Sequence, residues 1–127
     1  MTPEQKIKHA ILKSVFEGND KPVPAVTDEN VDDLWDDSEE EPGYWDARYE
    51  FREGEVETNV PSESSRHYET KSVAAIMPDG TWVGWTYWYG GGKHGNPEEI
   101  EWMEDAYDLT CTEEEKVVTV RTFTKAD

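Results

Sequence analysis

The stretch AAIMPDGTWVGWTYWY, residues 74–89, decides the fold that the sequence predicts. Its PDG triplet at 78–80 is a strong turn signal, because proline presets φ for a turn and glycine accepts a positive φ. Strand-like residues flank the triplet from about 67 to 77 and from 81 to 89. The stretch therefore predicts a β-hairpin within an antiparallel sheet.

The returning strand, residues 81–89, carries five aromatic residues. Alternation along a strand places Trp85 on one face and Trp82 and Trp88 on the other, while Gly84 makes room for a neighbouring ring. The main interpretation is a central core strand. The alternative is a platform on which sugars, bases or a partner's side chains stack against Trp82 and Trp88.

Two helices are predicted on either side of this hairpin. Thr2 as N-cap, Pro3 at the first position and Gln5 completing a capping box begin a helix that ends at Gly18. The NPEE sequence at 96–99 begins a second, amphipathic helix that continues to about residue 109. Its outer arc is acidic and consists of Glu98, Glu101, Glu104, Asp105 and Asp108.

Two further strands complete the expected fold. Apolar and charged residues alternate over 47–52, which predicts a strand that returns through a turn at Glu53 and Gly54. A last strand is predicted over 117–124. The expected class is α+β, with a mainly antiparallel sheet of about five strands, an N-terminal helix and one amphipathic acidic helix before the last strand.

At 127 residues the chain has the usual size of one domain. We expect a single domain over 1–127. It would consist of a helix at 1–18, a connector and acidic segment at 19–43, and the sheet with the acidic helix at 44–127.

Charge is concentrated in two segments. The formal net charge is −18, and residues 28–41 and 96–115 each contain nine acidic residues and no basic one. Residues elsewhere are balanced, with twelve acidic and twelve basic side chains. For the first segment, a short helix from Thr27 and an ordered acidic loop remain equal alternatives, because like charges at i,i+4 oppose a helix.

This charge excludes some classes of partner. Direct binding to nucleic acid or to an anionic membrane needs Lys and Arg, so a basic partner is favoured instead. The sequence has neither a signal-peptide pattern nor an apolar run long enough to span a membrane. With one cysteine, Cys111, the chain forms no internal disulfide, and we expect a cytoplasmic location.

No complete catalytic, cofactor or metal motif is found. The GGGKHG loop at 90–95 lacks the serine or threonine that follows the lysine of a P-loop, since Lys93 precedes His94. Acidic residues next to Cys111 would raise rather than lower a thiol pKa. The acidic runs lack the spacing of a calcium-binding loop. We therefore expect a protein that is not an enzyme.

The runs DGTWVGWTYWYGGGKHG at 79–95 and SSRHYE at 64–69 resemble a type of small uncharacterised protein from tailed bacteriophages. The resemblance covers roughly residues 44–124 and transfers no catalytic residue. It implies a small accessory protein made in an infected bacterium. Such proteins often inhibit or redirect host enzymes, and strongly acidic ones sometimes do so by imitating nucleic acid.

The leading hypothesis is a non-enzymatic inhibitor or modulator that occupies a basic, nucleic-acid-binding surface of a host protein. The residues expected to bind that partner are Asp32, Asp33, Asp36, Asp37, Glu98, Glu101, Asp105, Asp108, Trp35, Trp82 and Trp88. The alternative is a module that binds a small ligand or glycan through Trp82, Trp88, Lys93 and His94. Neither hypothesis fixes the oligomeric state.

Overall fold

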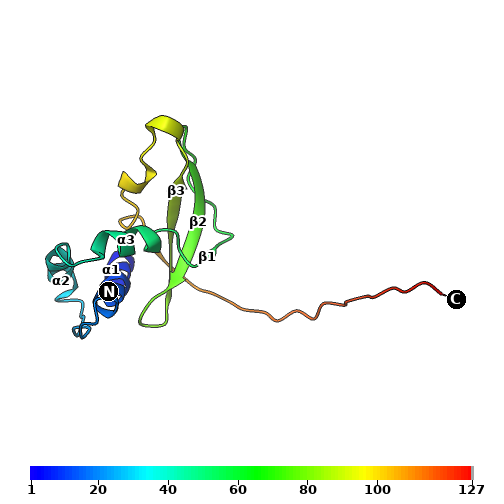
Figure 1. The fold of residues 1–127 in the computed structure, drawn as a ribbon, viewed down its shortest axis with the longest axis horizontal. Helices are drawn as coiled ribbons and strands as arrows, with labels where there is room; N and C mark the ends of the chain where they lie inside the picture. Colours follow the sequence, from blue (N-terminus) through cyan, green and yellow to red (C-terminus); the bar gives the residue numbers. More distant parts are fainter. Residues whose placement is uncertain (127) are drawn as a thin grey trace.

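The structure is a computed structural model that describes residues 1–126, apart from the side chain of His94. Within these residues it is an α+β fold of three α-helices and one four-stranded antiparallel sheet in the order β1-β2-β3-β4 (Figure 1). The strands are β1 (Val56–Glu57), β2 (Glu69–Ile76), β3 (Trp82–Tyr89) and β4 (Tyr107–Leu109), and the helices are α1 (Pro3–Gly18), α2 (Val31–Ser38) and α3 (Tyr44–Phe51).

The predicted hairpin is confirmed. Strands β2 and β3 pair along all eight residues, from Glu69 opposite Tyr89 to Ile76 opposite Trp82. The turn closes through a 2.7 Å hydrogen bond from the Met77 N–H to the Thr81 carbonyl, and Gly80 has the positive φ, 85°, that the PDG signal requires. The other two strands pair with the edges of this hairpin, β1 with β2 and β4 with β3.

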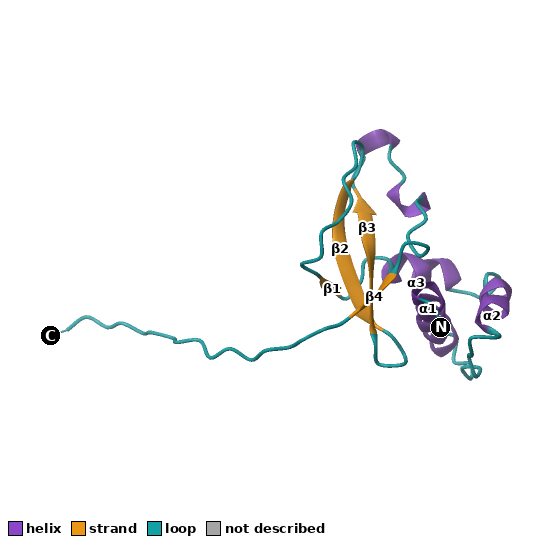
Figure 2. Ribbon diagram, turned by 180° about the vertical axis from the view of Figure 1, so that it is seen from behind, coloured by secondary structure: helices purple, strands orange, loops and turns teal. Residues whose placement is uncertain are grey.

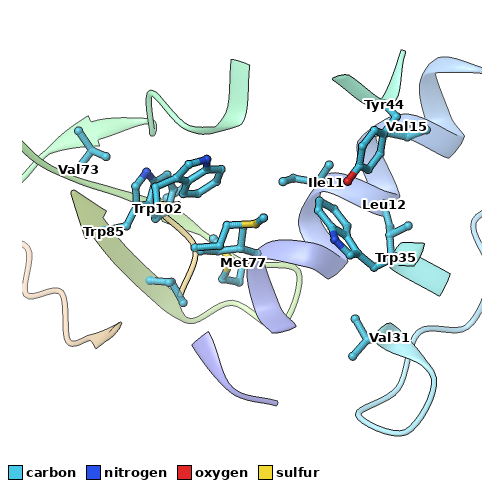
Figure 3. Close-up of a cluster of buried hydrophobic side chains, with 14 residues drawn as sticks. Ile11, Leu12, Val15, Val31, Trp35, Tyr44, Val73, Met77, Trp85 and Trp102 are labelled. Atoms are coloured by element: carbon cyan, nitrogen blue, oxygen red, sulfur yellow. The ribbon is translucent and has the colours of Figure 1, made fainter. Parts of the chain in front are cut away.

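The helices lie on one side of the sheet, so that the other face has no helical layer (Figure 1). Helix α1 begins with the predicted Thr2–Gln5 capping box and buries Ile7, Ile11 and Leu12 completely. Figure 3 shows Ile11 and Leu12 on the same side of the core as Trp35 and Tyr44, with Met77 and Trp85 of the sheet side opposite them. Helix α1 is therefore the centre of the hydrophobic core.

The first acidic segment forms a helix rather than a loop. In α2, Val31 and Trp35 are buried, and the Ser38 hydroxyl donates a 2.7 Å hydrogen bond to the Trp35 carbonyl. Burial against α1 outweighs the repulsion between like charges at i,i+4, as expected where tertiary packing supplies most helical stability.

The strand predicted over 47–52 is wrong, because residues 47–51 belong to helix α3 and Arg52 is its C-cap. Alternation of Ala47, Tyr49 and Phe51 resembled a strand, but Tyr44, Ala47 and Phe51 are also spaced i, i+3, i+7, which is helical. Packing decides between the two patterns, since Phe51 stacks on Trp85 with ring centroids 5.5 Å apart. Gly54, with φ 72°, then turns the chain into β1.

The amphipathic helix predicted over 97–109 is also wrong. Only a short 3₁₀ turn, η2 (Pro97–Glu99), forms there, and the segment ends as strand β4. Trp102 packs on Trp85 with centroids 5.3 Å apart, on the face of the sheet that the helices cover. Tyr107 pairs with Gly84, where its ring occupies the space that a Cβ would fill. A straight helix cannot contact both faces of one sheet.

The strand predicted over 117–124 is not present. Residues 110–126, which we call the C-terminal arm, contain neither helix nor strand and are exposed throughout. Figure 2 shows the arm running away from the sheet on the side opposite the helices. The final strand is instead β4, so the described residues form four strands rather than about five.

Candidate functional site

Helix α2 carries one dense group of exposed carboxylates, which we call the acidic surface. It comprises the exposed acids of α2 and its flanks, namely Asp28, Glu29, Asp32, Asp33, Asp36, Asp37, Glu39 and Glu40. The surface exists because the helix turns its apolar residues toward α1 and leaves every acidic one outside. One helical turn, about 6 Å along the axis, separates Asp32 from Asp36 and Asp33 from Asp37.

Basic groups compensate only a small part of this charge. Within the described residues, Lys8 binds Asp32 at 3.1 Å and the amino-terminal nitrogen binds Asp28 at 3.3 Å, and no other acid of the surface has an ion pair. The hydrogen bonds from Lys8 and Gln5 lower the pKa of Asp32 below its ordinary value. The remaining carboxylates keep their charge available to an external cation.

Trp35, which was predicted as an aromatic anchor beside these acids, belongs to the core. Its side chain is 8% exposed and packs edge-on against Tyr44, with ring centroids 5.1 Å apart. Arg48 lies 5.7 Å and Lys8 6.0 Å from its ring centroid. Trp35 therefore positions α2 and offers no surface to a partner.

An exposed aromatic pair lies next to the acidic surface instead. Trp45 and Tyr49 of α3 are 49% and 44% exposed, and their i,i+4 spacing places them on one side of the helix. Trp45 packs on Tyr44, with ring centroids 5.1 Å apart, and its ring also contacts the Arg48 guanidinium, which lies 5.5 Å away. Trp45 is thus held in place by its neighbours, and both aromatic side chains remain accessible.

Tyr44 connects this pair to the acids of α2. Burial raises the pKa of the Tyr44 hydroxyl, the charge and hydrogen bond of Arg48 oppose that rise, and the charges of Glu39 and Asp36 add to it. The Tyr44 ring packs on Trp35 of α2 and on Trp45 of α3, with ring centroids 5.1 Å apart in each case. Sequence reasoning missed Trp45 and Tyr49 because it read 47–52 as a strand; the helical spacing of Tyr44, Ala47 and Phe51 was the available signal.

The second acidic segment does not form a comparable surface. Glu98, Glu101 and Asp105 are exposed, but they follow an irregular path rather than one helical face. Asp108 lies on β4 and accepts a 2.8 Å hydrogen bond from Lys6, which raises the pKa of Lys6. Asp108 therefore connects β4 to α1.

The two tryptophans of the predicted aromatic platform, Trp82 and Trp88, lie at separate places on the sheet. Trp82 and Trp88 are both partly buried, and they lie six residues, roughly 20 Å, apart along β3. Trp82 borders a groove of about 430 Å³ together with Val56, Ala74 and Leu109. Trp88 lies beside Pro97 and Trp102 over a cleft with no room for a water molecule. The two rings do not share one ligand site.

The glycine loop is packed against its own neighbours. A Cβ on Gly91 would lie 2.7 Å from the Tyr68 ring, and one on Gly95 would lie 2.8 Å from the Gly91 Cα. The Tyr68 hydroxyl accepts a 3.2 Å hydrogen bond from the Asn96 N–H. Lys93 is exposed, whereas the predicted role of His94 lies outside the described side chains. The glycines thus allow a close loop–ring contact.

Groups that could support catalysis are dispersed in the described residues. Cys111 is exposed on the arm, and among the residues that the structure describes no three His, Cys, Asp or Glu side chains are arranged to hold a metal ion. No helix described here has the length and hydropathy needed to cross a membrane. Comparisons with protein-family models, curated proteins and solved structures gave no match for this chain.

Proposed function

We propose that the chain is a non-enzymatic interaction protein that binds a basic, nucleic-acid-binding surface of another protein through its acidic surface. The observation that supports this proposal most directly is the group of exposed carboxylates on α2, of which only Asp28 and Asp32 have a basic partner in the described residues. Such a surface attracts a basic protein over a distance and orients it on approach.

The like charges themselves support a role in binding. Asp32 and Asp36, and likewise Asp33 and Asp37, repel each other at i,i+4 and weaken α2. A helix that only had to cover α1 could carry neutral or mixed charges at these exposed positions. The arrangement of two rows of carboxylates, repeating about every 6 Å, supports the narrower proposal that it replaces nucleic-acid phosphates.

Trp45 and Tyr49 supply the apolar part of the proposed contact. Charged rims contribute mainly to the rate and orientation of association, whereas aromatic side chains that become fully buried contribute most of the affinity. Both rings are nearly half exposed in the free protein. A basic partner that docks on α2 would therefore cover them as anchors.

The charge dependence is tested with two matched sets of substitutions. The first reverses charge on α2 by Asp33→Lys, Asp36→Lys and Asp37→Lys. The control makes the same change in charge at exposed positions of the other segment by Glu98→Lys, Glu101→Lys and Glu104→Lys. The tagged wild-type chain should capture a basic protein from bacterial lysate at low salt. The α2 set should abolish capture, and the control set should retain most of it.

Competition tests the nature of the partner's surface. A short DNA duplex should release the captured protein, because both ligands would occupy the same basic site. Capture of no basic protein at low salt would contradict the proposed function. Equal losses from the two substitution sets would show that only net charge matters and that α2 is not the binding surface.

Trp45→Ala tests the anchor separately from the charge. We expect binding to weaken about tenfold or more, which corresponds to roughly 1.4 kcal/mol or more. The free energy of unfolding should change by less than about 1 kcal/mol, because the ring is half exposed. Isothermal titration with the captured partner and urea denaturation measure the two effects; unchanged affinity would exclude Trp45 from the contact.

A further inference from the structure

The face of the sheet without helices contains an apolar groove of about 430 Å³, which we call the sheet groove. It spans the sheet: Val56 of β1 is paired with Ala74 of β2, and Trp82 of β3 is paired with Leu109 of β4. Their strand neighbours Val73 and Val83 point the other way into the core. Val56 remains 47% exposed, so the groove is open to a ligand.

The C-terminal arm carries exposed apolar side chains of the kind that such a groove accommodates. It begins at the rim of the sheet groove, which Thr110, Cys111 and Thr112 help to line, and then runs outward (Figure 2). Its apolar side chains are not buried, since Val117 is fully exposed and Phe123 is 84% exposed. The sequence VVTVRTFT at 117–124 is rich in residues that favour strands. Such a segment is expected to order when it binds.

The charge of the outer part of the arm favours an acidic body as its partner. Residues 116–126 contain three basic residues and no acidic one, whereas residues 1–115 contain 29 acidic and nine basic residues. The outer part of the arm, residues 116–126, is thus cationic and apolar, whereas the chain as a whole is strongly acidic and Glu57 lines the sheet groove. It is the part that the acidic body of another copy would attract, while two bodies repel each other.

We propose that the arm of one copy binds in the sheet groove of a second copy, with Phe123 inserted between Val56 and Trp82. Two reciprocal contacts of this kind make a symmetric dimer by arm exchange. Residues 117–124 would extend about 26 Å as a strand, which matches the eight residues of β2 beneath them. The second copy is favoured over the arm's own groove, because residues 117–124 are exposed and run outward, away from their own body (Figure 2).

This surface is separate from the acidic surface. The groove lies on the sheet face opposite the helices, so a dimer of this kind leaves both α2 faces free (Figure 1). A dimer would then present two acidic surfaces to one target, which raises apparent affinity when both can bind. The inference itself does not depend on the proposed function.

Sedimentation equilibrium of the full chain over a wide range of concentration provides the test. We expect a dimer whose dissociation constant rises about tenfold or more with Phe123→Asp. Thr122→Asp makes the same change in charge on the opposite side of the arm and should raise the dissociation constant less than Phe123→Asp does. On the groove, Val56→Asp should act like Phe123→Asp. Val23→Asp is the control, because Val23 is also exposed, at 37%, but lies outside the sheet and does not line the groove.

Mixing the two defective variants tests the exchange directly. Phe123→Asp keeps an intact groove, and Val56→Asp keeps an intact arm, so their mixture should contain a heterodimer with one working contact. Each variant alone should be less associated than the mixture. All these substitutions lie at exposed positions, and circular dichroism checks that each variant is folded.

Three outcomes would overturn the inference. A wild-type chain that is monomeric at every concentration and protects residues 117–124 from hydrogen exchange would show that the arm binds its own body. A monomer with an unprotected arm would show that the arm is free. A dimer that is insensitive to both Phe123→Asp and Val56→Asp would associate through another surface.

Discussion

The two acidic segments have the same number of charges but take different structures. Residues 28–41 contain helix α2 with its carboxylates exposed, whereas residues 96–115 contain a 3₁₀ turn, an irregular crossing, strand β4 and the start of the C-terminal arm. Acidic content therefore does not decide the backbone of either segment. The decisive difference is where the apolar residues between the charges are buried.

In the first segment, all apolar residues pack on one side. Val31 and Trp35 are buried and Leu34 is partly buried against the same helical layer, so a helix satisfies them together. In the second segment, Trp102 enters the core on one face of the sheet, and Tyr107 and Leu109 cover Gly84 on the other face. The chain must pass around the edge of β3, which excludes a continuous helix.

The largest expected effect comes from removing the tryptophan that holds each segment. Trp35→Ala and Trp102→Ala should each reduce the free energy of unfolding by about 3–5 kcal/mol, since both rings are buried, at 8% and 5% exposure. Urea denaturation measures both. A loss below about 1 kcal/mol for Trp102→Ala would show that the second segment is not docked on the core, and the comparison between the segments would fail.

A smaller effect should follow from filling the space at Gly84. A Cβ there would lie 2.7 Å from both the Leu109 Cδ1 and the Tyr107 ring, so Gly84→Ala should displace β4 and cost about 1–3 kcal/mol. Gly18→Ala is the matched control, because nothing lies within 4 Å of its Cβ and alanine favours a helix. Thermal denaturation should separate the two variants; equal melting temperatures would mean that β4 does not depend on Gly84.

The smallest effect distinguishes two neighbouring carboxylates of α2. Asp32→Asn should cost about 0.2–1 kcal/mol at pH 7, because Asp32 is paired with Lys8 in an exposed position. Asp33→Asn should be neutral or slightly stabilising, because it removes repulsion and breaks no ion pair.

The difference between these two variants should depend on pH. Folding lowers the pKa of Asp32, so its contribution to stability is complete above the ordinary carboxyl pKa of 3.8 and is lost as the pH falls through the lower, folded value. The two variants should therefore converge in strong acid. Denaturation curves at neutral and acid pH check this, and a difference that persists in acid would exclude the ion pair as its cause.

The elements that the sequence predicted correctly are those with a local signal. The PDG turn fixed the β2–β3 hairpin, and the capping box at Thr2 fixed the start of α1. Gly84 was expected to make room for a ring, and the Tyr107 ring occupies that space. Each of these features depends on residues whose backbone preference is strong without tertiary contacts.

The elements that were predicted wrongly depend on contacts between distant residues. Residues 47–52 satisfy both helical and strand patterns, and the stacking of Phe51 on Trp85 selects the helix. Residues 97–109 have ideal helical spacing, yet their apolar side chains contact two faces of the sheet. Sequence spacing cannot reveal which surface a side chain will reach. For the same reason the sequence predicted Trp35, Trp82 and Trp88 as anchors and did not point to Trp45.

The contact between Trp85 and Trp102 also gives the protein an optical signal. The two indole rings lie 5.3 Å apart at an interplanar angle of 41°, close enough for their electronic transitions to couple and inclined enough for the coupling to be chiral. Far-ultraviolet circular dichroism should therefore contain an exciton couplet in addition to the backbone signal. The couplet should vanish in Trp102→Phe. In the wild-type chain its decay on heating would report when the second acidic segment leaves the core.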